Sequence, residues 1–393
     1  MTIILSEASD RIQSSPTLAL NARAAELKSE GRDIVSLSVG EPDFDTPQHI
    51  KEAAIKAIHD GKTKYTAVDG TPSLKQAVVE KFARENNLKY EPQQTLVSCG
   101  AKHSIFNLCM ALLNPGDEAI IPSPYWVSYP EMVKITGAKP VFINTTIEQN
   151  YKITASQLEK AITPKTRLLF LNSPSNPSGM VYSKVELQQL AEVLLKHPKI
   201  LILSDDIYEH ILWQNEPFAN ILNACPSLYD RTIVVNGVSK AYAMTGWRIG
   251  YAAGPMPLIN AMKKIQSQST SCPCSISQAA AEVALSGNQT CIKKMVAEFK
   301  KRHDLVFDTL KTINGIKVIP SNGTFYSFPD MQSIIDSMEN INSDLELSEY
   351  LLNEAGVALV PGSAFGVPGA VRISYAINIE VLADTLAKIK ECI

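Results

Sequence analysis

Residues 232–253 read TIVVNGVSKAYAMTGWRIGYAA, and the rest of the chain is organised around this stretch. Its β-branched start predicts a short buried strand, and the Asn-Gly pair that follows is typical of a turn. Ser239 and Lys240 therefore come directly after a strand end. Lys240 has apolar and aromatic neighbours, with Arg248 nearby and no carboxylate to pair with. A lysine after a strand is usually a solvated cation, but burial and a like charge both lower a lysine pKa, and a neutral amine can form a Schiff base.

The composition is that of an ordinary globular protein. The chain has 393 residues, of which 45% are hydrophobic and 20% charged, and its net charge is −3. The length predicts two to three domains. The absence of a basic block or an acidic tail from the sequence argues against nucleic acid or an anionic membrane as the main partner. No apolar run reaches the roughly 20 residues that a membrane span needs.

The N-terminus and the cysteines indicate a cytoplasmic protein. The first apolar patch has no basic residue before it and acidic residues soon after it, which makes it a poor signal peptide. The seven cysteines show no regular spacing beyond Cys272-Pro273-Cys274. We therefore expect reduced thiols and no metal site.

Between residues 95 and 253 the sequence alternates between short apolar strands and helices. The expected strands are 95–98, 119–121, 140–143, 167–171, 200–204, 232–235 and 249–253. Expected helices here and just before are 46–60, 71–87, 104–113, one from 154 onward, and 183–197. Capping-box patterns at 154–157 and 183–186 predict the starts of the last two. Apolar strands that alternate with helices predict a parallel sheet covered on both faces.

The two ends of the chain have a different pattern. The N-terminal end predicts a helix at 18–27 and a strand at 33–39. After about residue 287 we expect long amphipathic helices at 292–313, 345–354 and 380–391, with short strand-like runs at 318–319, 325–328, 357–360 and 371–375. This pattern is typical of an α+β module, and it predicts a second, smaller domain.

Polar and aromatic residues gather at the carboxyl ends of the expected strands, which is where such sheets bind ligands. These residues are Lys102, Trp126, Asn176, Asp205, Tyr208 and Lys240. Because they come from separate strands, we predict a binding site at this edge. The small-residue turn at 99–102, which opens a helix, is a weaker candidate for holding a phosphate group.

If Lys240 forms a Schiff base, pyridoxal phosphate is a cofactor that the other residues could serve. The protein must then supply a carboxylate for the ring nitrogen and donors for the phenolic oxygen. Asp205 could be that carboxylate, or it could cap the following helix. Tyr208 and Asn176 could donate to the phenolic oxygen.

Five residues have a further functional interpretation, and three of them also have a structural one. Ser239 and Arg248 could hold the phosphate, Arg248 through its fork of donors. Trp126 could stack on a ring or belong to the core. Arg372, in an otherwise apolar strand, could bind a substrate carboxylate or form a structural ion pair. Gly40 could bring bare backbone against a ligand or merely end a strand.

Several motifs in order give the chain a resemblance to the aspartate-type class I aminotransferases, which are pyridoxal-phosphate enzymes of fold type I. The resemblance covers essentially the whole chain. The motifs are Gly-Glu-Pro-Asp-Phe at 40–44, Pro-Tyr-Trp at 124–126, Asn-Ser-Pro-Ser-Asn-Pro-Ser-Gly at 172–179, Asp-Asp-Ile-Tyr at 205–208, Ser-Lys at 239–240, Gly-Trp-Arg-Ile-Gly at 246–250 and Arg-Ile-Ser-Tyr at 372–375.

The resemblance implies an α/β fold with a mostly parallel mixed sheet between layers of helices. It also implies three segments: an N-terminal arm with part of the small domain at 1–45, a large cofactor-binding domain at 46–287, and a small α+β domain at 288–393. Tyr65 is similar to a family tyrosine that reaches the phosphate in the neighbouring subunit, so the resemblance implies a homodimer with shared active sites.

The resemblance also implies a role for each site residue. Lys240 would carry the cofactor and then act as the base at the substrate Cα, Asp205 would pair with the ring nitrogen, and Tyr208 would bond the phenolic oxygen with Asn176. Trp126 would stack on the ring. The phosphate would be surrounded by Gly100, Ala101, Lys102, Ser239 and Arg248. The substrate would be held by Gly40, Trp126, Asn176, Arg372 and Lys102.

The implied reaction is transfer of the amino group from L-aspartate to 2-oxoglutarate, giving oxaloacetate and L-glutamate. Related aminotransferases that use prephenate, aromatic or alanine-type substrates are the alternative. Two positions stay open. The family often has a serine where this chain has Gly237, which would leave one phosphate hydroxyl missing. Lys102 would bind either the side-chain carboxylate of the substrate or only the phosphate side.

Overall fold

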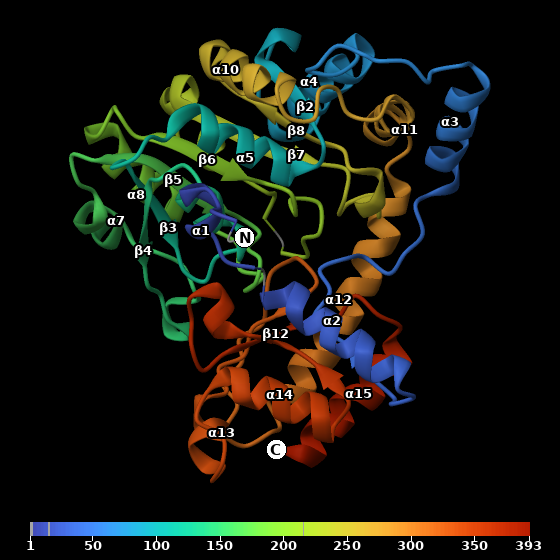
Figure 1. The fold of residues 1–393 in the computed structure, drawn as a ribbon, viewed down its shortest axis with the longest axis vertical. Coiled ribbons are helices and arrows are strands. Elements are labelled where there is room, and N and C mark those ends of the chain that lie inside the picture. Colours follow the sequence, from blue (N-terminus) through green and yellow to red (C-terminus); the bar gives the residue numbers. More distant parts are fainter. Residues whose placement is uncertain (1–2, 15, 215) are drawn as a thin grey trace.

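The computed structural model describes residues 3–14, 16–214 and 216–393. Within them, the largest sheet has seven strands in the order β2-β8-β7-β6-β5-β3-β4. This sheet and its helices form the upper part of the molecule in Figure 1, and the C-terminal segment, in orange and red, forms the lower part. The strands are β2 (Thr95–Ser98), β3 (Glu118–Pro122), β4 (Lys139–Ile143), β5 (Thr166–Asn172), β6 (Leu201–Asp205), β7 (Thr232–Gly237) and β8 (Gly250–Ala253).

The large sheet is mixed, because one of its strands runs against the others. Strands β7, β6, β5, β3 and β4 pair in parallel, whereas β8 pairs antiparallel with both β7 and β2. The mostly parallel mixed sheet is confirmed, but the all-parallel sheet expected from apolar runs alone is wrong for β8. The physical reason is the connection from β7 to β8, which contains no crossover helix of the kind that joins parallel neighbours.

Helices cover both faces of this sheet. One face packs against α5 (Ala101–Leu112), α6 (Ser128–Lys134) and α10 (Met256–Ser267), and the other against α4 (Pro72–Asn86), α8 (Lys184–Lys196) and α11 (Ser275–Ser286). On β3, Ile121 packs in the first layer and Ile120 in the second, and both are fully buried. Successive residues of a strand point to opposite faces, so a fully apolar strand serves two cores.

Local capping explains where several of these helices begin. Thr71 accepts a hydrogen bond from the Leu74 N–H before α4. Both predicted capping boxes are present, at Ser183 before α8 and at Thr154 before α7 (Ala155–Ala161). The helices α6, α10 and α11 were not expected from the sequence pattern. The other helices are α1 (Glu7–Asp10), α2 (Pro16–Ser29), α3 (Gln48–His59), α9 (Ile221–Ala224), α12 (Thr290–Leu310), α13 (Gln332–Ser337), α14 (Asp344–Glu354) and α15 (Ile379–Cys392).

Two small sheets lie outside the large one, and the first of them joins the N-terminal and C-terminal segments. β1 (Val35–Ser36) pairs in parallel with β10 (Val357–Ala358). β11 (Val360–Pro361), β12 (Val371–Ser374) and β9 (Tyr326–Ser327) form an antiparallel sheet in that order. The strand expected at 357–360 is therefore divided, because its two halves pair with different partners. The strand expected at 33–39 is shorter than predicted, and no strand forms at 318–319.

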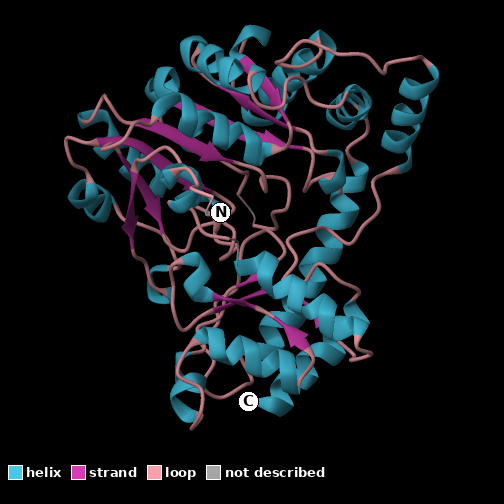
Figure 2. Ribbon diagram, viewed as in Figure 1, coloured by secondary structure: helices cyan, strands magenta, loops and turns pink. Residues whose placement is uncertain are grey.

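Figure 2 shows the small sheets beneath the large one, with helices packed around them. A separate apolar cluster, which includes Phe299, Phe325, Ile373 and Leu382, fills this lower part. The long helix α12 connects the two parts and contributes Phe299 to the lower cluster (Figure 1). Within the described ranges, no helix has both the length and the hydropathy that a membrane crossing requires.

Candidate active site

A pocket of about 400 Å³ lies where the carboxyl ends of the large sheet meet the small three-stranded sheet. The ends of β5, β6 and β7 open into it, as expected for ligands of an α/β sheet. The pocket is lined by most of the predicted site residues, namely Gly40, Ala101, Lys102, Trp126, Asn176, Asp205, Tyr208, Ser239, Lys240, Arg248 and Arg372. The structure therefore brings together residues that lie far apart in sequence.

Lys240 projects into this pocket from the loop after β7. Its Nζ donates a hydrogen bond to the Gly40 carbonyl oxygen at 2.6 Å and lies 5.7 Å from the centroid of the Tyr208 ring. Burial, and then the positive charge of Arg372, lower the pKa of Lys240 to about 8. The solvated surface cation is therefore the wrong interpretation, because the amine lies inside the pocket and a pKa of about 8 leaves part of it unprotonated near neutral pH.

Asp205 is the last residue of β6 and is only 4% exposed. Its Oδ2 accepts a hydrogen bond of 2.6 Å from the Tyr129 hydroxyl, and its Oδ1 accepts one of 3.3 Å from the Ile207 N–H. Burial raises the pKa of Asp205 to about 6, although the Tyr129 hydroxyl opposes that rise. The Ile207 contact is a local turn rather than a helix cap, since no helix begins there.

Arg372 reaches the pocket from β12 and is 3% exposed. Its Nη1 donates to the Asn176 Oδ1 at 2.9 Å and its Nη2 to the Ser38 carbonyl oxygen at 2.6 Å. Among the described residues, the Arg372 Nε has no hydrogen-bond partner, and Arg372 takes part in no ion pair. The structural ion pair considered from sequence is therefore not formed, and a buried cation is left to face the pocket.

A second part of the pocket wall, at the N-terminus of α5, is also cationic. Gly100 is the residue before α5 and has φ +88°, and an added Cβ would collide with the Arg248 guanidinium. Arg248 donates from Nη1 to the Thr245 carbonyl oxygen at 2.8 Å. The first N–H groups of α5, at Ala101 and Lys102, have no partner inside their own helix. A helix N-terminus beside an arginine is suited to an anion such as a phosphate group.

Lys102 and Trp126 form a pair on the pocket wall. The Lys102 Nζ lies 4.8 Å from the centroid of the Trp126 ring. Burial, with a smaller contribution from Arg248, lowers the pKa of Lys102. Trp126 is half-buried and lines the pocket, so its ring is available for stacking rather than enclosed in the core.

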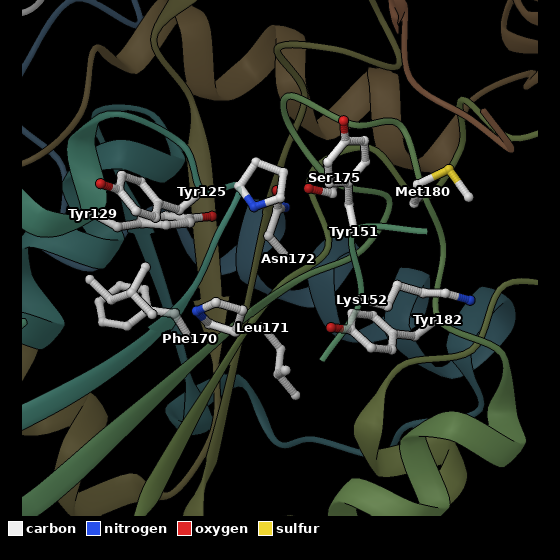
Figure 3. Close-up of a pocket in the computed structure, with 13 residues that line it drawn as sticks. Tyr125, Tyr129, Tyr151, Lys152, Phe170, Leu171, Asn172, Ser175, Met180 and Tyr182 are labelled. Atoms are coloured by element: carbon white, nitrogen blue, oxygen red, sulfur yellow. The ribbon is translucent and has the colours of Figure 1, made fainter. Parts of the chain in front are cut away.

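Figure 3 shows a second cavity, of about 20 Å³, next to the first. Tyr129 and Asn172 line both cavities, and the second is otherwise enclosed by Tyr125, Tyr151, Lys152 and Tyr182, among others. Its volume is enough for about one water molecule. It is therefore too small to hold a cofactor.

Comparison with known proteins identifies the family. The model for aminotransferase classes I and II matches residues 32–389. The chain belongs to this family. The chain is 55% identical over 390 residues to an aspartate/prephenate aminotransferase of Nitrosomonas europaea, with 98% of each chain covered. It is 50% identical over 390 residues to one from Cereibacter sphaeroides, again with 98% of each covered.

Solved aminotransferase structures share the complete fold. The aspartate aminotransferase of Rhizobium meliloti superposes with a TM-score of 0.96 at 49% identity, covering 100% of this chain and 99% of that one. The Thermus thermophilus aspartate aminotransferase with maleate gives a TM-score of 0.93 at 42% identity, with 100% of both chains covered. These matches confirm the fold class and show that the chain is a transaminase.

Two predicted residues lie outside the pocket lining of this aminotransferase. Gly100 does not line the pocket itself, but its lack of a side chain leaves room for the guanidinium of Arg248, which does. Tyr65 is 92% exposed and lies on the loop between α3 and α4, where it lines a different surface depression. Within one chain, Tyr65 does not join the other site residues.

The sequence pattern missed several pocket residues. Tyr129 lies in the first turn of α6, three residues after Trp126, and its N–H donates to the Trp126 carbonyl oxygen; that short spacing was an available signal. Tyr326 lies in the expected strand-like run 325–328, for which the sequence pattern indicated no functional role. Asn172 ends β5, and its Nδ2 donates to the Asp205 carbonyl oxygen at 2.9 Å. Glu41 contacts the Thr245 hydroxyl at the pocket mouth.

Proposed function

We propose that this aminotransferase uses pyridoxal phosphate to transfer the amino group of L-aspartate to 2-oxoglutarate. The observation that carries the substrate assignment is the buried Arg372, a cation without a carboxylate partner among the described residues. Lys102 offers a second cation in the same pocket. Two cations suit a dicarboxylic substrate, and both aspartate and 2-oxoglutarate are dicarboxylates.

The donor set of the pocket fits the cofactor. A buried carboxylate, Asp205, lines the pocket, and so do the N-terminus of α5 and Arg248. The reactive amine of Lys240 and the Trp126 ring lie in the same pocket. Each of these groups suits one part of pyridoxal phosphate: the carboxylate suits the ring nitrogen, the amine the aldehyde, the Trp126 ring the face of the cofactor ring, and the anion site the phosphate.

Each of these residues has a proposed task. Asp205 keeps the cofactor ring nitrogen protonated, and Tyr208 and Asn176 donate to the phenolic oxygen. Trp126 stacks on the ring. The phosphate is held by Gly100, Ala101, Lys102, Ser239 and Arg248, together with Tyr65 from a second subunit. When bound, the cofactor supplies the aldehyde that accepts the amino group and a ring that takes up electrons from the substrate Cα.

Lys240 is the proposed base of the reaction. A general base works best with a pKa near the operating pH, and burial with the Arg372 charge gives Lys240 a pKa of about 8. Arg372 and the Gly40 backbone orient the substrate α-carboxylate. The Lys240 Nζ already lies 2.6 Å from the Gly40 oxygen, so the amine reaches the place where the substrate Cα would be held.

The absorption spectrum and a steady-state survey test this assignment. The purified protein should absorb in the near-UV and visible range, and L-aspartate should change that spectrum. Turnover should be fastest with aspartate and 2-oxoglutarate. A protein that is inactive with aspartate in every pairing would contradict the proposed substrates.

Prephenate is a second candidate substrate, because relatives that are 50–55% identical over 98% of their length carry both aspartate and prephenate in their names. Prephenate is also a dicarboxylate, so the two cations of the pocket suit it equally. The survey should include prephenate with an amino donor, and phenylpyruvate and alanine to cover the aromatic and alanine-type alternatives. Activity with phenylpyruvate but not with prephenate would contradict a requirement for the second carboxylate.

We also propose a cytoplasmic homodimer with shared active sites, without nucleic-acid or membrane partners. The exposed Tyr65 supports sharing, since a residue with its proposed role must reach another subunit. The proposed domains are the arm at 1–45, the large domain at 46–287 and the small domain at 288–393. Sedimentation velocity tests the assembly. A monomer with full activity would contradict the shared site.

A further inference from the structure

Tyr326, on β9 of the small sheet, touches three parts of the pocket at once. It is fully buried, and its hydroxyl lies 2.9 Å from the Tyr208 hydroxyl, which follows β6 of the large sheet. The Arg372 guanidinium stands over its ring, 4.6 Å from the centroid. A Cβ at Gly40 would lie 2.5 Å from the Tyr326 hydroxyl oxygen. One side chain therefore contacts the residues proposed to serve both cofactor and substrate.

The pair of hydroxyls has only one possible arrangement when the cofactor is bound. Burial raises the pKa of both tyrosines, so each hydroxyl keeps its single proton. If the Tyr208 hydroxyl donates its hydrogen bond to the phenolic oxygen of the cofactor, it cannot also donate one to Tyr326. Tyr326 must then be the donor to Tyr208. A hydroxyl that accepts one hydrogen bond becomes a better donor of the next.

The ring of Tyr326 acts on Arg372 in a different way. A desolvated guanidinium is stabilised by the negative face of an aromatic ring. Arg372 has Tyr326 at 4.6 Å and Phe365 at 5.0 Å, while two of its nitrogens are fixed by Asn176 and Ser38. The ring holds the guanidinium in place without neutralising it, so the charge remains available to a carboxylate.

We propose that Tyr326 is a positioning residue that fixes the Tyr208 hydroxyl as a donor to the cofactor and supports the Arg372 guanidinium that receives the substrate α-carboxylate. This inference rests on the proposed function. It adds a physical link between the large and small sheets, in which the cofactor contact and the substrate contact depend on the same ring.

Two substitutions separate the hydroxyl from the ring. Tyr326→Phe keeps the ring and removes the donor, and Tyr326→Leu removes both. Tyr375→Phe is the matched control, because Tyr375 is equally buried beside the same sheet but does not line the pocket. The readouts are the pH midpoint of the absorption spectrum of the cofactor-loaded protein, the Kd for succinate as a non-reacting dicarboxylate, and the Kd of the cofactor-free protein for pyridoxal phosphate.

Tyr326→Phe should raise the pH midpoint of the spectrum by about 0.5–1 pH unit. Without the hydrogen bond from Tyr326, the Tyr208 hydroxyl is a weaker donor and stabilises the ionised phenolic oxygen of the cofactor less. The charged groups that face the two hydroxyls are Arg372 on β12, Asp205 on β6 and Lys240 after β7, and all three remain in the variant. Succinate affinity should stay within about twofold, since the ring is kept. Pyridoxal phosphate should bind the cofactor-free variant more weakly.

Tyr326→Leu should show the same midpoint shift and should also weaken succinate binding by about 3–30-fold. In a Tyr208→Phe background, Tyr326→Phe should cause no further midpoint shift, because the hydroxyl through which it acts is gone. Tyr375→Phe should match the wild type in all three measurements.

An unchanged midpoint in Tyr326→Phe would overturn the link to Tyr208, and wild-type succinate affinity in Tyr326→Leu would overturn the support of Arg372. If Tyr326→Leu does not fold, Tyr326→Phe still tests the link to Tyr208, and Tyr326→Met, a larger side chain that also lacks the ring, takes its place in the succinate measurement. Failure of the proposed function is distinct, because it would show as a wild-type protein that binds no pyridoxal phosphate or does not turn over aspartate.

Discussion

The Tyr129 hydroxyl donates a 2.6 Å hydrogen bond to the Asp205 carboxylate, and both side chains are buried. Tyr129 is held there by Phe170 and Trp126, whose ring centroids lie 4.9 Å and 5.4 Å from its own. A hydrogen bond to the ionised form of a carboxylate lowers its pKa, so Tyr129 opposes the effect of burial on Asp205. The residue that the sequence pattern missed therefore helps to keep the proposed partner of the ring nitrogen ionised.

Tyr129→Phe tests this relationship. The pKa of Asp205, about 6 in the intact site, should rise further, so that a larger fraction of the carboxyl is protonated at pH 7. Loss of one hydrogen bond to a charged group corresponds to about 1.5–3 kcal/mol. We expect weaker binding of pyridoxal phosphate at pH 7, with affinity recovering toward pH 9. Tyr125→Phe, a neighbouring half-buried tyrosine, is the control. Equal affinity for wild type and Tyr129→Phe across this pH range would contradict the role.

Lys240→Ala should leave a folded protein that binds the cofactor without a covalent bond and has lost its base. Removal of a general base lowers turnover by about 10²–10⁴-fold, and loss of the attachment point adds to this. Single-turnover absorbance with L-aspartate measures the effect, and mass spectrometry after borohydride reduction shows whether the bond to Lys240 is absent. Lys388→Ala, at an exposed lysine paired with Asp33, is the control. Full turnover by Lys240→Ala would refute the assignment.

The sequence alone predicted the parts of the structure that depend on short-range patterns. Apolar runs located the strands of the large sheet, and capping boxes located the starts of α7 and α8. The strand-end rule located the pocket, since Asn176, Asp205 and Lys240 all line it. Whether Lys240 is reactive could not be decided from its neighbours in sequence, because the charge that lowers its pKa belongs mainly to Arg372, 132 positions away.

What the sequence did not predict depends on long-range pairing. β8 is as apolar as its neighbours, so its antiparallel direction follows only from the connection that leads to it. In the sequence, Tyr129 and Tyr326 look like ordinary aromatic core residues. Only the fold brings their hydroxyls to Asp205 and Tyr208. Tyr65 is exposed, and a single chain holds no partner for its proposed role.

Arg372→Lys keeps the charge but removes the planar fork of donors. Since the guanidinium is fixed by Asn176 and Ser38, a lysine cannot reproduce its geometry. We expect KM for aspartate and for 2-oxoglutarate to rise by about 10–100-fold, the equivalent of a lost bidentate contact. Steady-state kinetics with both substrates measures it. Unchanged KM values for both would show that the α-carboxylate is bound elsewhere.

Gly237→Ser tests whether the missing serine deprives the site of a phosphate hydroxyl. Gly237 pairs with Gly250 on β8, and a Cβ there would lie 3.1 Å from the Gly250 Cα and 3.2 Å from the Ile207 Cδ1. The added side chain therefore meets backbone, and the variant should lose about 1–3 kcal/mol of stability without a gain in cofactor affinity. Gly246→Ser, where a Cβ meets open space, is the control. Tighter binding of pyridoxal phosphate by Gly237→Ser would reverse this conclusion.

Asp206→Asn should flatten the pH dependence of stability of the cofactor-free protein. Burial, and then the nearby Glu209, raise the pKa of Asp206 to about 7. Between the unfolded pKa near 4 and this value, the folded chain holds a proton that the unfolded chain has released. Stability therefore falls as pH rises through this window, with a slope of up to about 1.4 kcal/mol per pH unit from this one group. Urea unfolding at pH 5 and pH 7.5 measures it, with Asp336→Asn at an exposed position as the control. Equal slopes for wild type and Asp206→Asn would mean that Asp206 is ionised throughout, and that its hydrogen bonds from Ser204 and Asn220 outweigh burial.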